Sequence, residues 1–359
     1  MIETTLDHGI HAYSAAGFAS LAAVVMFLKN DSANASRFCD IAFFIQEKIG
    51  IRNAAETLHI SWGFVLCYTR PLHEALNPTL EGYSKGLRDG DNEGAMLGLL
   101  LRFLYLPYIM GKNLGSIVEK FPTIAAQLEE SNRTKEIMAL RACWQMILNL
   151  QLPPNEDSKQ LEGEVYSQLS ETSQIPWKVA NENLANGELL LFFSDHEART
   201  KRLMNEEKGK TYSELIQGYF PSRIETFHRG IAWFATARRT RLRKHRSEAM
   251  RVKKQVAKWA KAGDPNIQHY HLLLNAEVAV LEKRFAKADA LYKQAISRAA
   301  RIGHLHHAAL FHERFAEYRL EVLGDKDDGK YHMEQAIRYY TEWGAVGKAE
   351  KLKKDVNKM

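Results

Sequence analysis

Three residues near the C-terminal end have types and an order that could bind a phosphate group. Gly344, Gly347 and Lys348 lie within the stretch "YYTEWGAVGKAEKL". A phosphate-binding loop places a glycine five residues before its Gly-Lys pair and a Ser or Thr directly after the lysine. Those two positions hold Glu342 and Ala349. We therefore predict that Gly344 is the left-handed residue that ends a helix, and that another short helix begins nearby, at about residue 346.

A second Gly-Lys pair could also belong to a phosphate-binding loop, but its surroundings do not match that motif either. The stretch "EEKGKTYSE" has Thr211 after Gly209 and Lys210, but the position of the first glycine holds Met204. Its flanks are polar and helical in pattern, whereas a phosphate-binding loop follows a strand. We expect no hydrolysis of ATP or GTP.

Histidines are the next group that could do chemistry. His304, His306, His307 and His312 lie close together, and His312 begins a pattern that resembles the zinc-protease motif. That motif needs a second histidine four residues later, where Ala316 stands. Packed or solvated histidines are therefore the default interpretation, with a zinc or copper site as the alternative. We predict no metal site and no cofactor.

No other catalytic constellation is present, and we predict that the protein is not an enzyme. The sequence lacks a nucleophile elbow, a paired-cysteine motif and a dinucleotide fingerprint. Cys39, Cys67 and Cys143 are far apart and lie in apolar runs. They are typical of buried thiols in a reducing compartment, so we expect a cytoplasmic protein.

Two apolar runs could be mistaken for membrane spans. The run from Ala12 to Leu28 is interrupted by polar residues and is slightly short for a span. The stretch "AMLGLLLRFLYLPYIM" contains Arg102 and Pro107. We predict a buried helix in each case and no membrane span.

Apolar residues recur every three to four positions along almost the whole chain, which predicts helices. The segments between turn signals have helix length, and a repeat appears among them. In "NAEVAVLEKRFAKADALYKQAISRAARIG", Ala276 belongs to a first helix, and Ala288, Tyr292 and Ala295 share one face of a second. This is the tetratricopeptide-repeat pattern. The same spacing returns at three further places: Gly329, Met333 and Ala336; Ala35, Cys39 and Ala42; and Thr79, Tyr83 and Gly86.

Positive charge is concentrated in one segment. Residues 238–261 contain eleven Lys and Arg against the single acid Glu248, a formal charge of +10, whereas the whole chain carries +6. Solvated helix faces, with Leu242, Met250, Val252, Val256 and Trp259 turned inward, are one interpretation. A docking surface for an acidic protein partner is another, and binding to a nucleic-acid backbone or an anionic membrane surface is a third. The predicted partner-binding residues are Arg238, Arg239, Arg241, Arg243, Lys244, Arg246, Lys253 and Lys254.

The C-terminal third, and more weakly the whole chain, resembles the tetratricopeptide-like helical repeat region of very large signalling ATPases and multi-domain sensor kinases. The residues that carry the resemblance are Trp259, Ala260, Pro265, Asn266, Ala276, Glu277, the run "FAKADALYKQAI", Tyr340, Trp343, Gly344, Ala345, Lys348 and Leu352, with Tyr83, Gly86, Leu87, Gly90 and Asp91 upstream. The sequence lacks the ATPase and output modules of that family. The resemblance therefore implies a signalling or scaffolding arm rather than an inherited catalytic activity.

These observations predict an all-α protein, built as a single right-handed superhelical solenoid of tetratricopeptide-like helix pairs over residues 1–359. Residues 1–152 would form N-terminal repeats, residues 153–222 irregular or longer helices, and residues 223–359 the basic helices and C-terminal repeats. The predicted function is a non-catalytic protein-interaction scaffold. A nucleic-acid-binding solenoid that uses residues 238–261 is the alternative.

Overall fold

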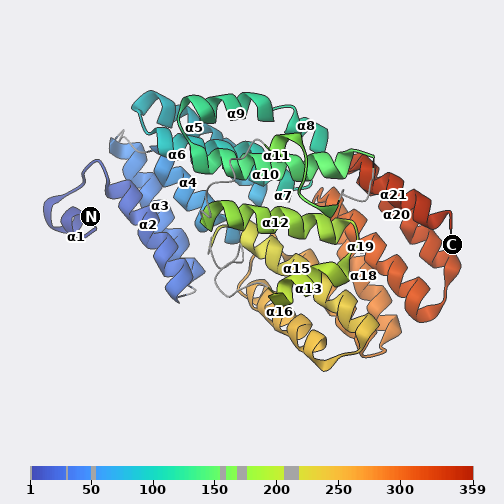
Figure 1. Cartoon of the computed structure of the whole chain (residues 1–359). Coiled ribbons are helices and arrows are strands. Elements are labelled where there is room, and N and C mark those ends of the chain that lie inside the picture. The colour runs from blue at the N-terminus through green and yellow to red at the C-terminus, as the bar shows by residue number, and fades with distance from the viewer. Residues whose placement is uncertain are drawn as a thin grey trace.

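The computed structural model describes residues 2–29, 31–49, 54–153, 159–167, 176–205 and 218–358. All regular secondary structure within these ranges is helical, which confirms the all-α prediction. The helices pack against one another in a compact arrangement, with the two termini at opposite ends (Figure 1). The gap at residues 206–217 contains the Gly209-Lys210 pair, which therefore lies outside the described residues.

The N-terminal half consists of short and medium-length helices. They are α1 (Ile2–His8), α2 (Ser14–Val24), α3 (Ser32–Ile49), α4 (Ala54–Phe64), α5 (Leu76–Asp89), α6 (Asn92–Leu100), α7 (Leu106–Ile109), α8 (Leu114–Val118), α9 (Phe121–Glu130) and α10 (Thr134–Gln151). Short π-helical turns extend α2 over Val25–Lys29 and join α6 to α7 over Leu101–Tyr105.

Longer helices form the second half. They are α11 (Glu164–Ser167), α12 (Pro176–Phe192), α13 (His196–Asn205), α15 (Pro221–Thr240), α16 (Arg243–Lys261), α17 (Gln268–Leu281), α18 (Phe285–Arg301), α19 (Leu305–Tyr318), α20 (Lys326–Trp343) and α21 (Val346–Val356). A π-helical turn, η6 (Arg319–Leu323), follows α19. Sequential neighbours pack as pairs, most extensively α17 with α18 and α19 with α20.

The repeat spacing found in the sequence marks the buried faces of these pairs. Ala276 on α17 and Ala288, Tyr292 and Ala295 on α18 are fully buried. The ring of Tyr292 stacks on Phe315 of α19 with centroids 4.8 Å apart, so it fills the space between one pair and the next. Small residues therefore let the helices approach, and one aromatic ring fills the remaining gap.

We expect Ala295→Leu to lower the free energy of unfolding by about 1–3 kcal/mol, because three extra carbons must enter a fully buried site between packed helices. Urea unfolding followed by circular dichroism measures this. An Ala290→Leu variant on the exposed side of the same helix is the control. Equal stability of both variants would contradict the assigned packing face.

Contacts between distant segments tie the two halves together. The last helix, α21, packs on α10, and the Asn113 side-chain amide donates to the Glu342 carbonyl oxygen at 3.0 Å. The Asn266 amide donates to the Cys67 and Arg70 carbonyl oxygens, both at 2.9 Å. In a simple solenoid each repeat contacts only its neighbours. These contacts therefore make the molecule more compact than that simple case.

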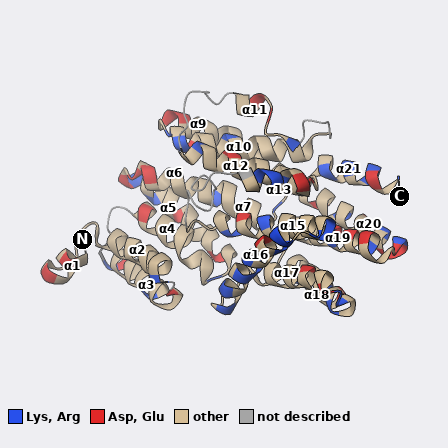
Figure 2. Cartoon of the chain, turned by 60° about the horizontal axis from the view of Figure 1, so that its bottom comes forward, with Lys and Arg blue, Asp and Glu red and all other residues tan. Residues whose placement is uncertain are grey.

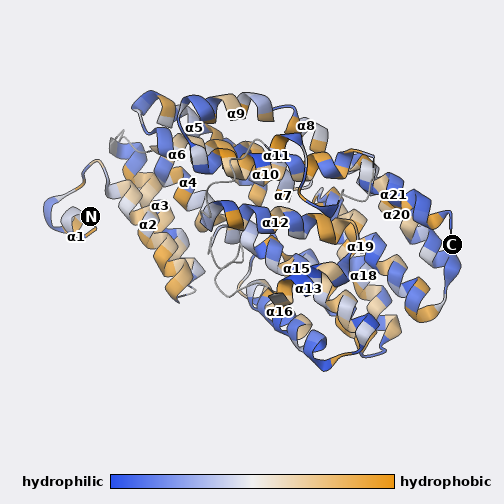
Figure 3. Cartoon of the chain, in the orientation of Figure 1, coloured by the Kyte–Doolittle hydropathy of each residue, from blue (hydrophilic) through white to orange (hydrophobic). Residues whose placement is uncertain are grey.

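The N-terminal apolar run forms α2 and its π-helical extension. Figure 3 shows that most of α2 is hydrophobic. Its first part is buried, as predicted: Ala15, Ala16 and Ala19 are at most 3% exposed. Its end is not, because Leu28 is 82% exposed. None of the helices described here combines the length and apolarity that crossing a membrane requires.

Candidate functional site

The basic segment covers the last turn of α15, a tight turn, and the whole of α16. Arg241 sits in the turn with a left-handed backbone, φ 56°, which ends α15. On α16 the predicted inward residues Val252 and Val256 are buried, but Leu242 and Met250 are exposed, at 47% and 36%. Leu242 lies in the turn before α16, so the helical period that we applied to it does not extend that far.

Most of the predicted partner-binding residues form an exposed basic face. Arg241, Arg243, Lys244, Arg246 and Lys254 are exposed, and Lys253 is half-buried. Lys and Arg gather along α16 in Figure 2. Among the described residues, the ion pairs of this segment involve Arg238, Arg239 and Arg251. The remaining basic side chains therefore keep their charge available for a partner.

Arg238 is not part of this exposed face, which corrects its assignment as a surface residue. Its side chain is only 7% exposed, and its guanidinium donates to Glu317 at 3.0 Å and to Glu321 at 3.2 Å. Glu317 in turn pairs with the fully buried Arg314. Arg238 thus belongs to an internal ion network that joins α15 to α19. Arg239 also contacts Glu321, at 3.0 Å, but keeps 49% of its side chain exposed.

A groove of about 860 Å³ runs beside the basic face. Arg239, Arg241 and Arg246 line it from the basic segment, and Lys283 lines it from the turn between α17 and α18. Apolar side chains, among them Phe285, also line the groove, together with Arg238 and with Glu321, which is paired with Arg238 and Arg239. A groove with cationic walls and apolar contacts matches an acidic peptide segment that carries hydrophobic residues.

The Gly344-Gly347-Lys348 run has a structural explanation. Gly344 ends α20 with φ 93°, and α21 begins at Val346, as predicted. A Cβ atom at Gly347 would collide with the carbonyl oxygen of Leu152, so this glycine allows α21 to lie close to the end of α10. Lys348 is 2% exposed, and its Nζ is 2.6 Å from Oε1 of Glu313. It is therefore committed to an internal ion pair rather than presented to a phosphate.

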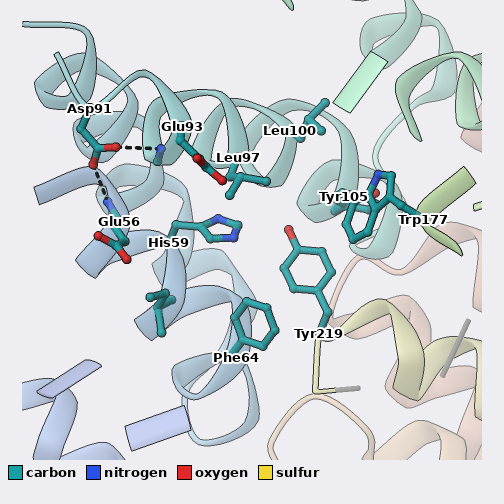
Figure 4. A pocket seen from close by; sticks show the side chains of 12 residues that line it. Glu56, His59, Phe64, Asp91, Glu93, Leu97, Leu100, Tyr105, Trp177 and Tyr219 are labelled. Atoms are coloured by element: carbon teal, nitrogen blue, oxygen red, sulfur yellow. Dashed lines mark hydrogen bonds between the residues drawn. The ribbon is translucent and has the colours of Figure 1, made fainter. Parts of the chain in front are cut away.

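A second cavity, of about 520 Å³, lies between α4, α6, the π-helical turn after α6 and the start of α12 (Figure 4). Its walls are largely aromatic: His59, Phe64, Tyr105, Trp177 and Tyr219. Carboxylates stand at one side: Glu56, Asp91 and Glu93.

The carboxylates of this cavity differ in the hydrogen bonds and ion pairs that they make within the chain. Asp91 accepts hydrogen bonds from the backbone amides of Gly94, at 2.9 Å, and Glu56, at 3.1 Å. Oε2 of Glu93 lies 3.6 Å from Nη2 of Arg133, which makes an ion pair. Burial, together with the neighbouring charges of Asp91 and Glu93, raises the pKa of Glu56. Aromatic faces with nearby carboxylates favour a cationic group, such as a Lys or Arg side chain.

The histidines of α19 are buried, as the default interpretation predicts, and they lie in a larger cluster. His304, His306 and His307 meet His269 of α17 and His228 of α15. All five side chains are at most 5% exposed. Ring nitrogens of His269, His304 and His307 lie within 4.8 Å of one another, the spacing of a metal-binding group.

Burial disfavours the charged form of these rings. Desolvation lowers the pKa of His304 to about 4, and the pKa values of His269, His306 and His307 lie well below the ordinary value for the same reason. Neutral imidazole is the form that binds metal ions.

Our sequence analysis missed His228, His269 and the aromatic cavity. His228 and His269 are 79 and 38 residues from His307, and no local spacing connects them. The cavity likewise combines residues of separate helices. Only the fold brings these groups together.

Comparison of the chain with protein-family models, with curated proteins and with solved structures gave no match. The resemblance to the repeat regions of signalling ATPases and sensor kinases therefore stays a prediction.

Proposed function

We propose that the chain is a non-catalytic protein-interaction scaffold or regulatory arm that binds an acidic segment of a partner protein. The observation that carries the proposal is the groove beside the exposed face of α16. Arg239, Arg241, Arg246 and Lys283 line this groove together with apolar side chains. The aromatic cavity between α4, α6 and the start of α12 offers a second contact, for a cationic side chain.

The architecture proposed for this role is a right-handed superhelical solenoid of tetratricopeptide-like pairs, whose last helix, α21, packs on α10. The packed pairs α17–α18 and α19–α20 support it. The buried thiols Cys39, Cys67 and Cys143 agree with a cytoplasmic setting. The relation to signalling ATPases and sensor kinases rests on the residues that carry the resemblance.

The alternative function is binding to nucleic acid through residues 238–261. The formal +10 charge of this segment favours it, because phosphate backbones attract clustered Lys and Arg. The apolar side chains of the groove favour a peptide, since contacts to a phosphate backbone use charged and polar groups.

Charge reversal on the basic face tests the proposal. The variant Arg241→Glu, Arg243→Glu, Arg246→Glu removes three exposed cations, two of which line the groove. We expect its affinity for a labelled peptide of glutamates and leucines to fall by about tenfold or more, because each lost contact contributes roughly 0.5–1 kcal/mol. Melting should change little. Fluorescence anisotropy measures the affinity, and binding by the unmodified protein should weaken between about 50 and 150 mM salt.

A matched control carries the same change in net charge on other helices: Lys293→Glu, Lys353→Glu, Lys354→Glu, at three exposed positions of α18 and α21. It should keep its affinity for the peptide. If both variants lose affinity for the peptide equally, the effect comes from net charge and not from this surface. If the unmodified protein binds a labelled DNA duplex and ignores the peptide, the nucleic-acid alternative replaces the scaffold.

A further inference from the structure

The histidine cluster contains a continuous chain of hydrogen-bonding groups that begins at a buried carboxylate. Oε1 of Glu188, on α12, is 2.6 Å from Nδ1 of His228. Nε2 of His228 is 3.2 Å from Nε2 of His307, and Nδ1 of His307 is 3.2 Å from Nε2 of His269. Burial would raise the pKa of Glu188, but His228, Arg199 and the Tyr108 hydroxyl together lower it below its ordinary value. Glu188 is thus a carboxylate and accepts a hydrogen bond.

This geometry assigns the protons when His228 is neutral. Its Nδ1 carries the proton, because the carboxylate of Glu188 can only accept, so its Nε2 has a free lone pair. Nε2 of His307 must then be the donor to His228. A neutral imidazole carries one proton, so Nδ1 of His307 has a lone pair that points toward His269.

Two more nitrogens of the cluster lack a partner. Nδ1 of His269 and Nδ1 of His304 are buried and make no hydrogen bond within the described part of the chain. Both nitrogens of His306, whose ring stacks on His307 at 3.8 Å, are in the same state. A buried polar atom without a partner destabilises the folded state, because it has lost its hydrogen bonds to water. A ligand that accepts lone pairs would give His269 and His304 a partner, whereas the nitrogens of His306 stay unpartnered within the described part of the chain.

We propose that His269, His304 and His307 bind a late first-row transition-metal ion, with Zn²⁺ as the best match. Three imidazole nitrogens suit Zn²⁺ and leave one position of its tetrahedral shell for water or another small ligand. His307 binds through Nδ1, and its Nε2–H donates to His228, which is held in turn by Glu188. Carboxylate–histidine relays of this kind orient metal ligands and raise their basicity.

The ion would join α17 to α19 inside the second half of the molecule. Both helices belong to the predicted repeats, and the ligands are at most 5% exposed. Because the three ligands come together only in the folded chain, metal binding adds to the free energy of unfolding. The inference does not depend on the proposed partner, because the cluster is separate from the residues of the basic groove.

The experiment uses the full chain, unfolded in EDTA and refolded with and without Zn²⁺. Elemental analysis after dialysis should find about one zinc ion per chain, and the zinc-loaded protein should melt at a higher temperature than the EDTA-treated protein. Co²⁺ in place of Zn²⁺ should give the visible absorption of a tetrahedral ion. The absence of bound zinc together with an unchanged melting temperature overturns the proposal.

Variants locate the site. His307→Gln and His304→Gln each remove a ligand, one from within α19 and one from the residue that precedes it, and zinc should be lost from both. Glu188→Gln should weaken the affinity for zinc by about 10–100-fold. His312→Gln, a buried histidine on the same helix that bonds to His332, is the control and should keep its zinc. Retention of zinc by folded His304→Gln or His307→Gln protein, or its loss from folded His312→Gln protein, contradicts the assignment.

Discussion

Lys348→Met should lower the free energy of unfolding by about 3–5 kcal/mol, which is a large share of the stability of a typical domain. The substitution keeps most of the side-chain volume but removes the charge that faces Glu313, a residue only 2% exposed. The hydroxyl of Tyr340, at 2.8 Å, and that of Ser194 still bond to the carboxylate. Neither neutralises it, so a buried charge is left without its counterion.

Lys353→Met, at an exposed position of the same helix, is the control and should change stability by no more than about 0.5 kcal/mol. Adding Glu313→Gln to Lys348→Met removes the uncompensated charge and should restore part of the loss. Urea unfolding gives all four free energies. A Lys348→Met variant as stable as the control would mean that Lys348 is not needed to compensate a buried charge at Glu313. Loss of a nucleotide turnover in a fully stable variant would instead revive the phosphate-binding interpretation.

The features that sequence predicted well depend on neighbours along the chain. Ala288, Tyr292 and Ala295 share a helix face because of helical geometry alone, so their burial follows from their spacing. The end of α20 at Gly344 is local in the same sense, since a glycine there accepts the left-handed backbone.

The features that sequence missed depend on which helices meet. The ring of His307 contacts His228 of α15 and His269 of α17, and only the packing of three helices places them together. Whether a charged side chain is free to bind a partner also depends on which helices meet. A count of Lys and Arg over residues 238–261 gives the charge of the segment, but not which side chains already have a carboxylate partner on another helix.

Arg238 and Arg243 show this difference most sharply, since both belong to the basic segment and only one faces solvent. We expect Arg238→Met to lower the free energy of unfolding by about 3 kcal/mol, because Glu317, 9% exposed, loses one of its two guanidinium partners. Arg243→Met should leave stability within about 0.5 kcal/mol of the unmodified protein and should weaken binding of the acidic peptide instead.

The pH dependence of unfolding separates this ion network from simple packing. Burial alone would raise the pKa of Glu317, but Arg314, His196 and Arg238 together lower it well below its ordinary 4.5. A lowered carboxyl pKa stabilises the folded state above about pH 4.5, and that contribution is lost as the pH falls further, because the unfolded chain binds the proton first. The unfolded chains of the two proteins titrate alike, so the gap in stability between them depends on the pKa of Glu317 in each folded state. Arg238→Met removes part of the lowering, so this gap should stay constant as the pH falls to the pKa that Glu317 has in the folded variant, and should narrow at lower pH. A gap that does not narrow down to the lowest pH at which both proteins still fold would show that Arg238 acts through the packing of its aliphatic stem and not through its charge.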